Sequence, residues 1–218
     1  MIKAVIFDLD GTLLDTLQDL SNAVNAALEK EHMPQHSVDE VCRFVGNGVK
    51  KLMERAIPDG ENNPAFARTY QYFREYYAAH CKENTKLYPG IEELLEELEA
   101  CGIKTAIVSN KMDPAVKILN EDYFSGKMDA AIGESEEVPK KPAPDMVHKA
   151  LEELQIAPKE AVYVGDSDVD IETAKNSGLS CISVTWGFRS EAFLKEHGAT
   201  QLVHKPKEIL SLIEKMDK

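Results

Sequence analysis

The sequence has no long hydrophobic run, and no stretch approaches the 18 apolar residues that indicate a membrane-spanning helix. Positive charge is also scarce: 25 Lys and Arg residues against 38 Asp and Glu residues give a net charge of −13. Nucleic acids and anionic membranes bind proteins mainly through basic surfaces, so neither is an expected partner. The acids Asp8 and Asp10 come too early in the chain for the apolar segment of a signal peptide.

Cysteine and the common metal and nucleotide motifs are also sparse. The four cysteines are scattered along 218 residues without a Cys-x-x-Cys pair, and the six histidines show no metal-ligand spacing. We therefore expect reduced core thiols in a cytoplasmic protein rather than disulfides or a zinc site. The sequence has no P-loop, HExxH or GxGxxG motif. The composition, 43% hydrophobic and 29% charged, is that of an ordinary globular protein.

A short apolar run followed by two acids dominates the N-terminus. Ala4 to Phe7 are apolar, and Asp8-Leu9-Asp10-Gly11-Thr12 follows directly. The run predicts a buried strand, and the carboxyl end of a strand is where open α/β sheets bind ligands. Because residues i and i+2 of an extended chain point the same way, we expect Asp8 and Asp10 to share one small volume. Two carboxylates ~4 Å apart repel by ~4 kcal/mol at an effective dielectric constant of 20, so either a positive group lies nearby or one acid holds a proton.

The spacing of apolar residues divides the chain into two kinds of segment. Between residues 16 and 81, apolar and aromatic residues recur at helical spacing and no strand is expected. From residue 86 onward, helical patterns alternate with short apolar runs, which predicts βα units and a parallel sheet. We therefore expect a Rossmann-like α/β core domain, residues 1–15 and 82–218, with helices on both faces of its sheet. An all-helical domain, residues 16–81, is expected as an insertion after the first strand.

Polar groups follow four of the expected strands, or lie in the loops after them. Carboxyl ends of parallel strands share one edge of a sheet, so these groups are expected to meet there. The set consists of Asp8 and Asp10, Ser109 and Asn110, Lys141, and Asp166 and Asp170. Clustered carboxylates favour a hard divalent cation such as Mg²⁺, and a lysine with a hydroxyl can hold phosphoryl oxygens. A carboxylate nucleophile that forms an aspartyl-phosphate is one covalent route.

Each of these groups also has an ordinary structural explanation. Asp8 to Gly11 can be a solvated turn, Ser109-Asn110 a helix N-cap, and Lys141 a surface lysine. The segment Asp166-Ser167-Asp168-Val169-Asp170 opens like an EF-hand loop. However, the sixth residue of that loop is Ile instead of Gly and the twelfth is Ser instead of Glu, so the EF-hand interpretation fails.

Taken together, the four motifs resemble those of the haloacid dehalogenase-like hydrolases, over essentially the full chain. Asp8-Leu9-Asp10-Gly11-Thr12 matches the DxDGT motif, and Ser109 matches the second motif. Lys141, within Lys-Pro-Ala-Pro, matches the third, and Gly165-Asp166-Ser167-x-x-Asp170 matches the fourth. All four occur in order with suitable spacing.

The resemblance implies a role for each matching residue. Asp8 is the expected nucleophile and Asp10 the general acid and base, while Ser109 and Lys141 bind the phosphoryl group. Mg²⁺ ligands are expected from Asp8, the Asp10 carbonyl and Asp166, with Asp170 as a ligand or a support for the ligands. The dehalogenases lack an acid where Asp10 stands, so the chain looks like a phosphatase or phosphotransferase. A second acid also suits the chemistry, because it can protonate the leaving alkoxide and then deprotonate water.

The helical insertion resembles a C1-type cap, which in this family closes over the site and excludes water. Three segments look most like phosphoglycolate phosphatases: Val45-Gly46-Asn47-Gly48, Tyr88-Pro89-Gly90 and Val184 to Ser190. Close relatives with similar caps include β-phosphoglucomutases, pyrophosphatases and nucleotide phosphatases, and these remain alternatives. A phosphonatase would need a cap lysine in an apolar setting, which neither Lys50 nor Lys51 has.

We therefore expect a Mg²⁺-dependent phosphatase that hydrolyses a small phosphorylated metabolite, with 2-phosphoglycolate as the best guess. Further substrate contacts are expected from Thr12 and Asn110 in the core. In the cap, Arg43 is a candidate partner for a substrate carboxylate, and the loop Gly46, Asn47 and Gly48 permits close backbone approach. A surface arginine beside a helix-breaking turn explains the cap residues equally well. The expected assembly is a monomer or homodimer, and a non-catalytic metal-binding module is the remaining alternative.

Overall fold

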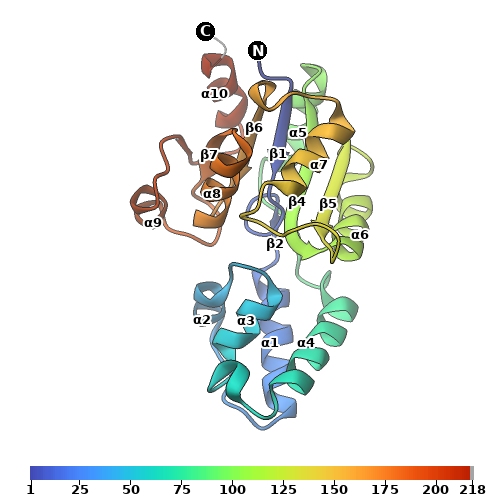
Figure 1. Cartoon of the computed structure of the whole chain (residues 1–218), viewed down its shortest axis with the longest axis vertical. Helices are drawn as coiled ribbons and strands as arrows, with labels where there is room; N and C mark the ends of the chain where they lie inside the picture. The colour runs from blue at the N-terminus through green and yellow to red at the C-terminus, as the bar shows by residue number, and fades with distance from the viewer. Residues whose placement is uncertain (217–218) are drawn as a thin grey trace. The chain divides into compact units, whose positions relative to one another are not determined.

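The structure is a computed structural model that describes residues 1–216, and it consists of two compact units (Figure 1). One unit contains Met1–Leu14 and the chain from Leu87 onward, and the other contains Asp15–Lys86. We call the first the core unit and the second the cap unit. The first strand is thus separated from the rest of its sheet by a helical insertion. The fold is a parallel α/β sheet with helices on both faces and an inserted helical cap.

The core unit is built on a six-stranded sheet in the order β5-β4-β1-β6-β7-β8, in which every pairing is parallel. The strands are β1 (Ala4–Phe7), β4 (Lys104–Met112), β5 (Ala130–Glu134), β6 (Ala161–Gly165), β7 (Ser180–Val184) and β8 (Leu202–Val203). The N-terminal strand β1 lies between β4 and β6. Strands β4 and β5 lie on one side of it, and β6, β7 and β8 lie on the other. Ligands of open α/β sheets bind at such a switch point, outside the carboxyl ends of the strands.

Alternate residues of the central strand enter two separate cores. Val5 and Phe7 pack in one apolar cluster with α5 (Ile91–Ala100), α6 (Asp113–Phe124) and α10 (Glu208–Met216). Ala4 and Ile6 pack on the opposite face, where the helices are α7 (Asp145–Leu154) and α8 (Asp168–Ser177). A strand covered on both faces must be apolar at every position, which is why β1 is a continuous run. The remaining helix of this unit is α9 (Glu191–Glu196).

The cap unit contains four α-helices and one 3-10 turn. They are α1 (Leu17–Lys30), α2 (Val38–Phe44), α3 (Val49–Ala56), η1 (Gly60–Asn62) and α4 (Phe66–His80). Their apolar stripes form a third cluster, which includes Leu20, Val24, Met53 and Phe73. A capping box begins α2: the Ser37 side chain accepts from the Glu40 N–H and the Glu40 carboxylate accepts from the Ser37 N–H.

The chain passes between the units through two short strands, β2 (Leu14–Asp15) and β3 (Lys86–Leu87), which form a two-stranded sheet. Inside the cap unit, the buried carboxylate of Asp19 accepts hydrogen bonds from Asn84 and Thr85. The donors are the backbone N–H and the side chain of each residue, at 2.8–3.0 Å. The beginning and the end of the insertion are therefore fastened together.

Three details differ from the sequence-based expectations. Strand β4 continues to Met112, so Ser109 and Asn110 lie within it instead of after it. The pair Asn63-Pro64 is typical of a helix start, with Asn as N-cap and Pro at the first helical position. Helix α4 instead begins at Phe66, and the Asn63 carboxamide accepts from the Ala65 N–H in a preceding turn. The four cysteines are free, as predicted, but only Cys81 is fully buried.

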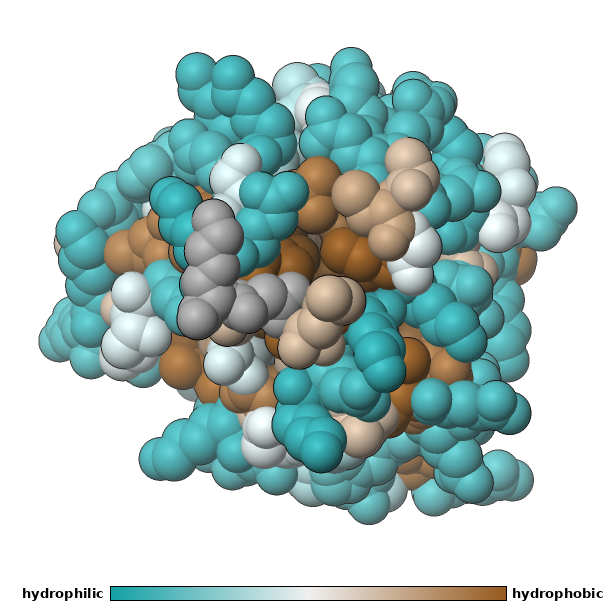
Figure 2. All heavy atoms as spheres, turned by 90° about the horizontal axis from the view of Figure 1, so that it is seen from above, coloured by the Kyte–Doolittle hydropathy of each residue, from teal (hydrophilic) through white to brown (hydrophobic). Residues whose placement is uncertain are grey.

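The surface is strongly polar, as the composition requires. Figure 2 shows one face on which hydrophilic side chains predominate, with apolar residues visible between them. Within residues 1–216, none of the helices has both the length and the apolar character needed to cross a bilayer.

Candidate active site

The site is organised around Asp8, which directly follows the central strand. Its backbone N–H donates to the Val164 carbonyl at 2.9 Å, which continues the pairing of β1 with β6 by one residue. The Asp8 side chain is almost completely buried, at 8% relative exposure for the residue. The sheet thus fixes a carboxylate at the switch point between β4 and β6.

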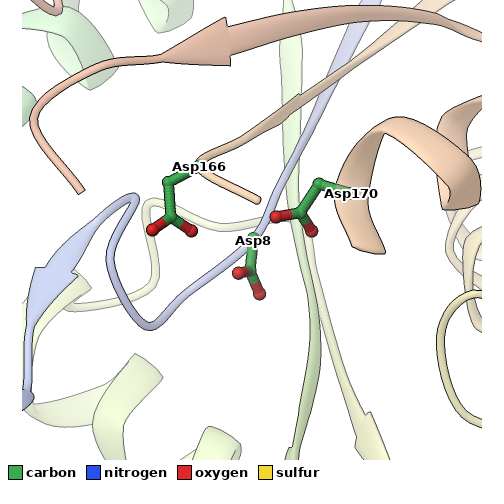
Figure 3. A group of neighbouring side chains, drawn as sticks. All are labelled: Asp8, Asp166 and Asp170. Carbon is green, nitrogen blue, oxygen red and sulfur yellow. The ribbon is translucent and has the colours of Figure 1, made fainter. Parts of the chain in front are cut away.

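Two further carboxylates lie beside Asp8. Asp166 follows β6, and Asp170 lies in the first turn of α8. Each residue contributes one oxygen to a group whose members are all within 4.8 Å of one another, and all three residues are buried. Figure 3 shows the three side chains arriving from three different segments around one small space. The prediction that distant acids converge is therefore confirmed for Asp8, Asp166 and Asp170.

Backbone from two loops closes tightly around Asp166. A Cβ placed on Gly11 or Gly187 would come within 2.4 Å of the Asp166 side chain, so only glycine fits at either position. Gly11 also has a φ of +88°, which disfavours any other residue. The neighbouring Phe188 N–H donates to Asp166 Oδ2 at 2.6 Å. These contacts fix the orientation of the Asp166 carboxylate.

Lys141 supplies positive charge in the middle of the acids. Its Nζ donates to Asp8 Oδ1 at 2.7 Å, to Asp170 Oδ1 at 2.8 Å and to the Tyr163 hydroxyl at 3.0 Å. The Asn110 carboxamide bonds the Lys141 backbone twice, accepting from its N–H at 2.8 Å and donating to its carbonyl at 3.1 Å. Asn110, predicted to contact substrate, thus has the structural task of holding the lysine loop.

The two oxygens of Asp170 are already engaged within the protein. Oδ1 lies near Lys141 Nζ and accepts from the Tyr163 hydroxyl at 3.2 Å, while Oδ2 accepts from the Ser167 N–H and hydroxyl at 3.1 and 2.6 Å. The hydrogen bond from the Ser167 N–H to Asp170 Oδ2 is part of the capping box of α8. Asp170 therefore holds Lys141 and the start of α8. This arrangement fits the second of the two roles expected for Asp170, a support for the metal ligands.

Burial and mutual repulsion dominate the electrostatics of this group. Burial raises the pKa of Asp8 to about 7, even though the Lys141 ammonium opposes the shift. Burial together with the Asp170 and Asp8 carboxylates raises the pKa of Asp166 well above its usual range. For Lys141, burial alone would lower the pKa, but the Asp170 and Asp8 carboxylates raise it far above its usual value. The group is short of positive charge, since one ammonium faces three acids.

This donor set fits a hard divalent cation. Carboxylate oxygens are the ligands that Mg²⁺ and Ca²⁺ prefer, and Mg²⁺ needs only one or two of them because it retains water. Asp8 and Asp166 are the natural protein ligands, because the Asp170 oxygens are occupied by hydrogen bonds. Added charge of +2 would relieve the repulsion that raises the pKa values of the two acids.

Asp10 lies near enough to Asp8 for its charge to add, after burial and the Asp170 carboxylate, to the raised pKa of Asp8, but a turn and not a regular strand places it there. β1 ends at Phe7, so the alternation of an extended strand does not extend to Asp10, which instead forms an isolated bridge with Leu14. Its carboxylate is absent from the group around Asp166 and pairs with Lys111, whose Nζ lies 2.8 and 3.1 Å from the two oxygens. A positive group was expected near the two acids, and each has its own lysine: Lys141 contacts Asp8 and Lys111 contacts Asp10.

Ser109 and Thr12 are both buried at the same end of the sheet. Ser109 is 2% exposed, and its hydroxyl oxygen accepts from the Lys111 N–H at 3.1 Å. The Thr12 hydroxyl is fully buried without a hydrogen-bond partner, although the Thr12 carbonyl accepts from the Trp186 indole N–H at 3.0 Å. Their predicted contacts with a phosphoryl group or substrate remain predictions.

The cap residues predicted to bind substrate lie on α2 and the loop after it. Arg43 is exposed in the last turn of α2. Gly46, Asn47 and Gly48 have φ values of +122°, +64° and +87°, so the loop follows a path that favours glycine. Arg55 holds this loop by donating to the Phe44 carbonyl at 2.6 Å and the Gly46 carbonyl at 3.1 Å. The substrate-binding role of the four predicted residues stays a prediction.

Sequence reasoning missed two residues of the site. Tyr163 is a polar residue in the otherwise apolar strand β6, which was the available signal for a buried hydroxyl. Lys111 lies two positions after Ser109, a spacing that predicts a shared side only in a regular strand, whereas the register of β4 shifts between Val108 and Met112.

Comparison with known proteins agrees with this geometry. The family model of haloacid dehalogenase-like hydrolases matches residues 5–184. The chain is 36% identical to the phosphoglycolate phosphatase of Aquifex aeolicus over 189 residues, 86% of each chain, and 34% identical to that of Yersinia pestis over 212 residues, 93% of this chain and 90% of the relative. A crystal structure of a candidate phosphoglycolate phosphatase from Lactobacillus delbrueckii subsp. bulgaricus superimposes with a TM-score of 0.91 at 38% identity, and the match covers 95% of this chain and 96% of that one.

The family-model match, residues 5–184, extends over both units and spans the positions of all four motifs. The chain belongs to the haloacid dehalogenase-like hydrolases, in their phosphoglycolate phosphatase-like branch, and is a phosphatase.

Proposed function

We propose that this phosphatase depends on Mg²⁺ and hydrolyses a small phosphorylated metabolite through an aspartyl-phosphate on Asp8, in the cytoplasm. The observation that carries the proposal is the Asp8 carboxylate at the switch point of the sheet, with Lys141 Nζ 2.7 Å away and Asp166 beside it. We take this carboxylate as the nucleophile, with Lys141 as the phosphoryl-binding group on one side and Asp166 as a metal ligand on the other.

The reaction would proceed in two displacements at phosphorus. In the first, an Asp8 oxygen attacks phosphorus, the bond to the leaving oxygen breaks, and Asp10 gives that oxygen a proton. In the second, Asp10 takes a proton from a water that attacks the same phosphorus, and the bond to the Asp8 oxygen breaks to release phosphate. Asp10 gives one proton in the first step and takes one in the second, so it ends in its starting state and protons and oxygens balance.

Two groups of the chain neutralise the charge that this chemistry gathers. Lys141 would donate to phosphoryl oxygens, and its hold on Asp8 would keep the nucleophile aligned. Bound Mg²⁺ would supply further electrostatic stabilisation of the phosphoryl group. Asp8 and Asp166 would hold the cation, and Asp170 would hold Lys141.

For the substrate, we propose 2-phosphoglycolate first, because the proteins to which the chain is similar carry that activity in their names. Cap residues such as Arg43 are candidate partners for the carboxylate of that ester. A screen of phosphate esters with and without Mg²⁺ tests this choice, with 2-phosphoglycolate, pyrophosphate, sugar phosphates and nucleotides as its members. Transfer of the phosphoryl group to a sugar, with β-glucose 1-phosphate and a bisphosphate activator present, would identify a mutase instead.

The nucleophile is tested by Asp8→Asn, which keeps the size of the side chain and removes its charge. We expect turnover of every ester to fall by roughly 10⁴-fold or more, because no other carboxylate can replace the attacking oxygen. Acid-quenched protein mixed with ³²P-labelled substrate should carry label in the wild type and none in the variant. A variant that stays folded, as judged by circular dichroism, and still hydrolyses esters at the wild-type rate would refute the proposal.

A further inference from the structure

Lys111 is a buried cation to which the two-step reaction described above assigns no role. Its side chain is 4% exposed, and its Nζ lies 2.8 and 3.1 Å from the two oxygens of Asp10. The Asp10 side chain is 19% exposed, so the pair lies at the boundary between protein and solvent. A lysine is buried at a cost unless it is paired, so its position must be explained by what it contacts.

The backbone fixes the point from which this lysine reaches Asp10. Lys111 lies in β4, two residues after Ser109, and its N–H donates to the Ser109 hydroxyl at 3.1 Å. The register of β4 against β5 shifts between Val108 and Met112, and within this irregular segment the Lys111 N–H contact with the Ser109 hydroxyl places the two residues next to each other. Asp10 meanwhile lies outside the group formed by Asp8, Asp166 and Asp170. Strand β4 therefore places the Lys111 ammonium against Asp10. Of the two acids in the Asp8-Leu9-Asp10 motif, Asp10 is the one that Lys141 does not contact.

We propose that Lys111 is a positioning residue that holds the Asp10 carboxylate where it can exchange a proton with the leaving oxygen and then with water. This inference rests on the proposed role of Asp10 and adds a residue to it. Contact with both carboxylate oxygens fixes the rotation of the Asp10 side chain as well as its place. A contact with one oxygen alone would leave the rotation of the Asp10 carboxylate unset.

The leaving group provides a specific test of this role. An alkoxide needs a proton as it departs, whereas p-nitrophenolate is a weak base and departs without one. Loss of Asp10 orientation must therefore slow the hydrolysis of an alkyl phosphate more than that of p-nitrophenyl phosphate. A lysine that bound the phosphoryl group itself would affect both esters equally.

The experiment compares Lys111→Met with wild type on ethyl phosphate and p-nitrophenyl phosphate at saturating Mg²⁺. We expect kcat/KM to fall at least about 10-fold for the alkyl ester and less than about 3-fold for the aryl ester, within the range of one lost acid–base contribution. Asp10→Asn should show the same selectivity, and the double variant should be no slower than Asp10→Asn alone, because both changes remove one function. Lys117→Met, which removes an exposed lysine of α6, should match wild type on both esters.

Equal losses on the two esters, or losses that multiply in the double variant, would overturn the proposal. Lys111→Gln, which keeps a neutral donor, repeats the measurement if the Met variant does not fold, with the same selectivity expected. The Asp8→Asn result separates this outcome from a failure of the proposed function, since loss of the nucleophile removes turnover of both esters.

Discussion

Both units bury carboxylates, but they treat them in opposite ways. In the cap unit, burial raises the pKa of Asp19, and the hydrogen bonds from Asn84 and Thr85 outweigh burial and lower it below its usual value. In the core unit, Asp8 and Asp166 face each other and Asp170, and their pKa values are raised. Burial is thus common to the two regions, whereas the partners differ: neutral donors in one, like charges in the other.

This difference separates a structural acid from a reactive one. Four hydrogen bonds to backbone and side chains leave Asp19 nothing to gain from a ligand. Asp8 and Asp166 retain an unfavourable interaction that a divalent cation would relieve. A perturbed pKa identifies a candidate site when burial and then like charges in a shared space raise it, with no neutral donors to compensate. Three predictions follow from this contrast, and each would break or sharpen it.

The largest effect is expected for Asp166→Asn. Asn removes the charge but can still accept from the Phe188 N–H, so the loop contact is preserved. Activity should fall by more than the roughly 10–100-fold typical of residues that only support metal ligands. Without metal, the variant should unfold at a higher temperature than wild type, by about 2–4 °C for each kcal/mol of repulsion removed.

Addition of Mg²⁺ supplies the internal control for Asp166→Asn. The wild type should gain stability, about 2.7 kcal/mol at 100 times the dissociation constant, while the variant gains far less. Differential scanning calorimetry with and without Mg²⁺ measures both quantities. If metal-free Asp166→Asn unfolds below wild type, the acids do not repel one another as described.

A smaller and opposite effect is expected for Asp19→Asn. The amide can no longer accept from every donor, and its own NH₂ faces the N–H groups of Asn84 and Thr85. The loss should be about 1–3 kcal/mol, with faster amide hydrogen exchange in residues 84–86. Urea unfolding and hydrogen exchange are the measurements.

Asp39→Asn is the matched control for the cap unit, because Asp39 is an exposed acid on α2. We expect it to change the free energy of unfolding by no more than about 0.5 kcal/mol. An equal loss in the two variants would mean that the hydrogen bonds of Asp19 contribute no more than a surface charge.

The pH dependence of stability should have opposite signs in the two regions. Asp19 has a lowered pKa in the folded state, so its contribution is complete above the unfolded value of about 3.9 and disappears as pH falls through the folded value. Asp8 has a raised pKa of about 7, so the metal-free protein should lose stability as pH rises from about 4 to 7. Denaturation of wild type, Asp19→Asn and Asp8→Asn across this range tests both signs. The advantage of Asp8→Asn over wild type should grow with pH.

The order of the elements could be predicted from sequence because each strand of the core is covered on both faces. A continuous apolar run such as β1 or β6 differs clearly from the helical spacing of residues 16–81. The convergence of Asp8, Asp166 and Lys141 also followed, because parallel strands end at one edge. These conclusions depend on patterns that extend over several residues.

Features set by a single residue's local geometry could not be predicted. The partner of Asp10 is one example, because the strand ends at Phe7 and the loop that follows brings the Asp10 carboxylate to Lys111. The pairing of Asn110 is another, because its carboxamide bonds the backbone of Lys141, 31 positions away, while its expected contact with substrate stays a prediction. Such pairings depend on loop paths, for which apolar periodicity carries no information.

The paired strands β2 and β3 have a consequence for the evolution of the enzyme. Both ends of the helical insertion leave the core from adjacent strands, so the core accommodates it as it would a hairpin loop. An insertion of different length or shape could occupy the same two attachment points without shifting any strand of the main sheet. Recombination could therefore exchange whole insertions in one event, and the phosphoryl chemistry of the acids at the sheet would be inherited unchanged.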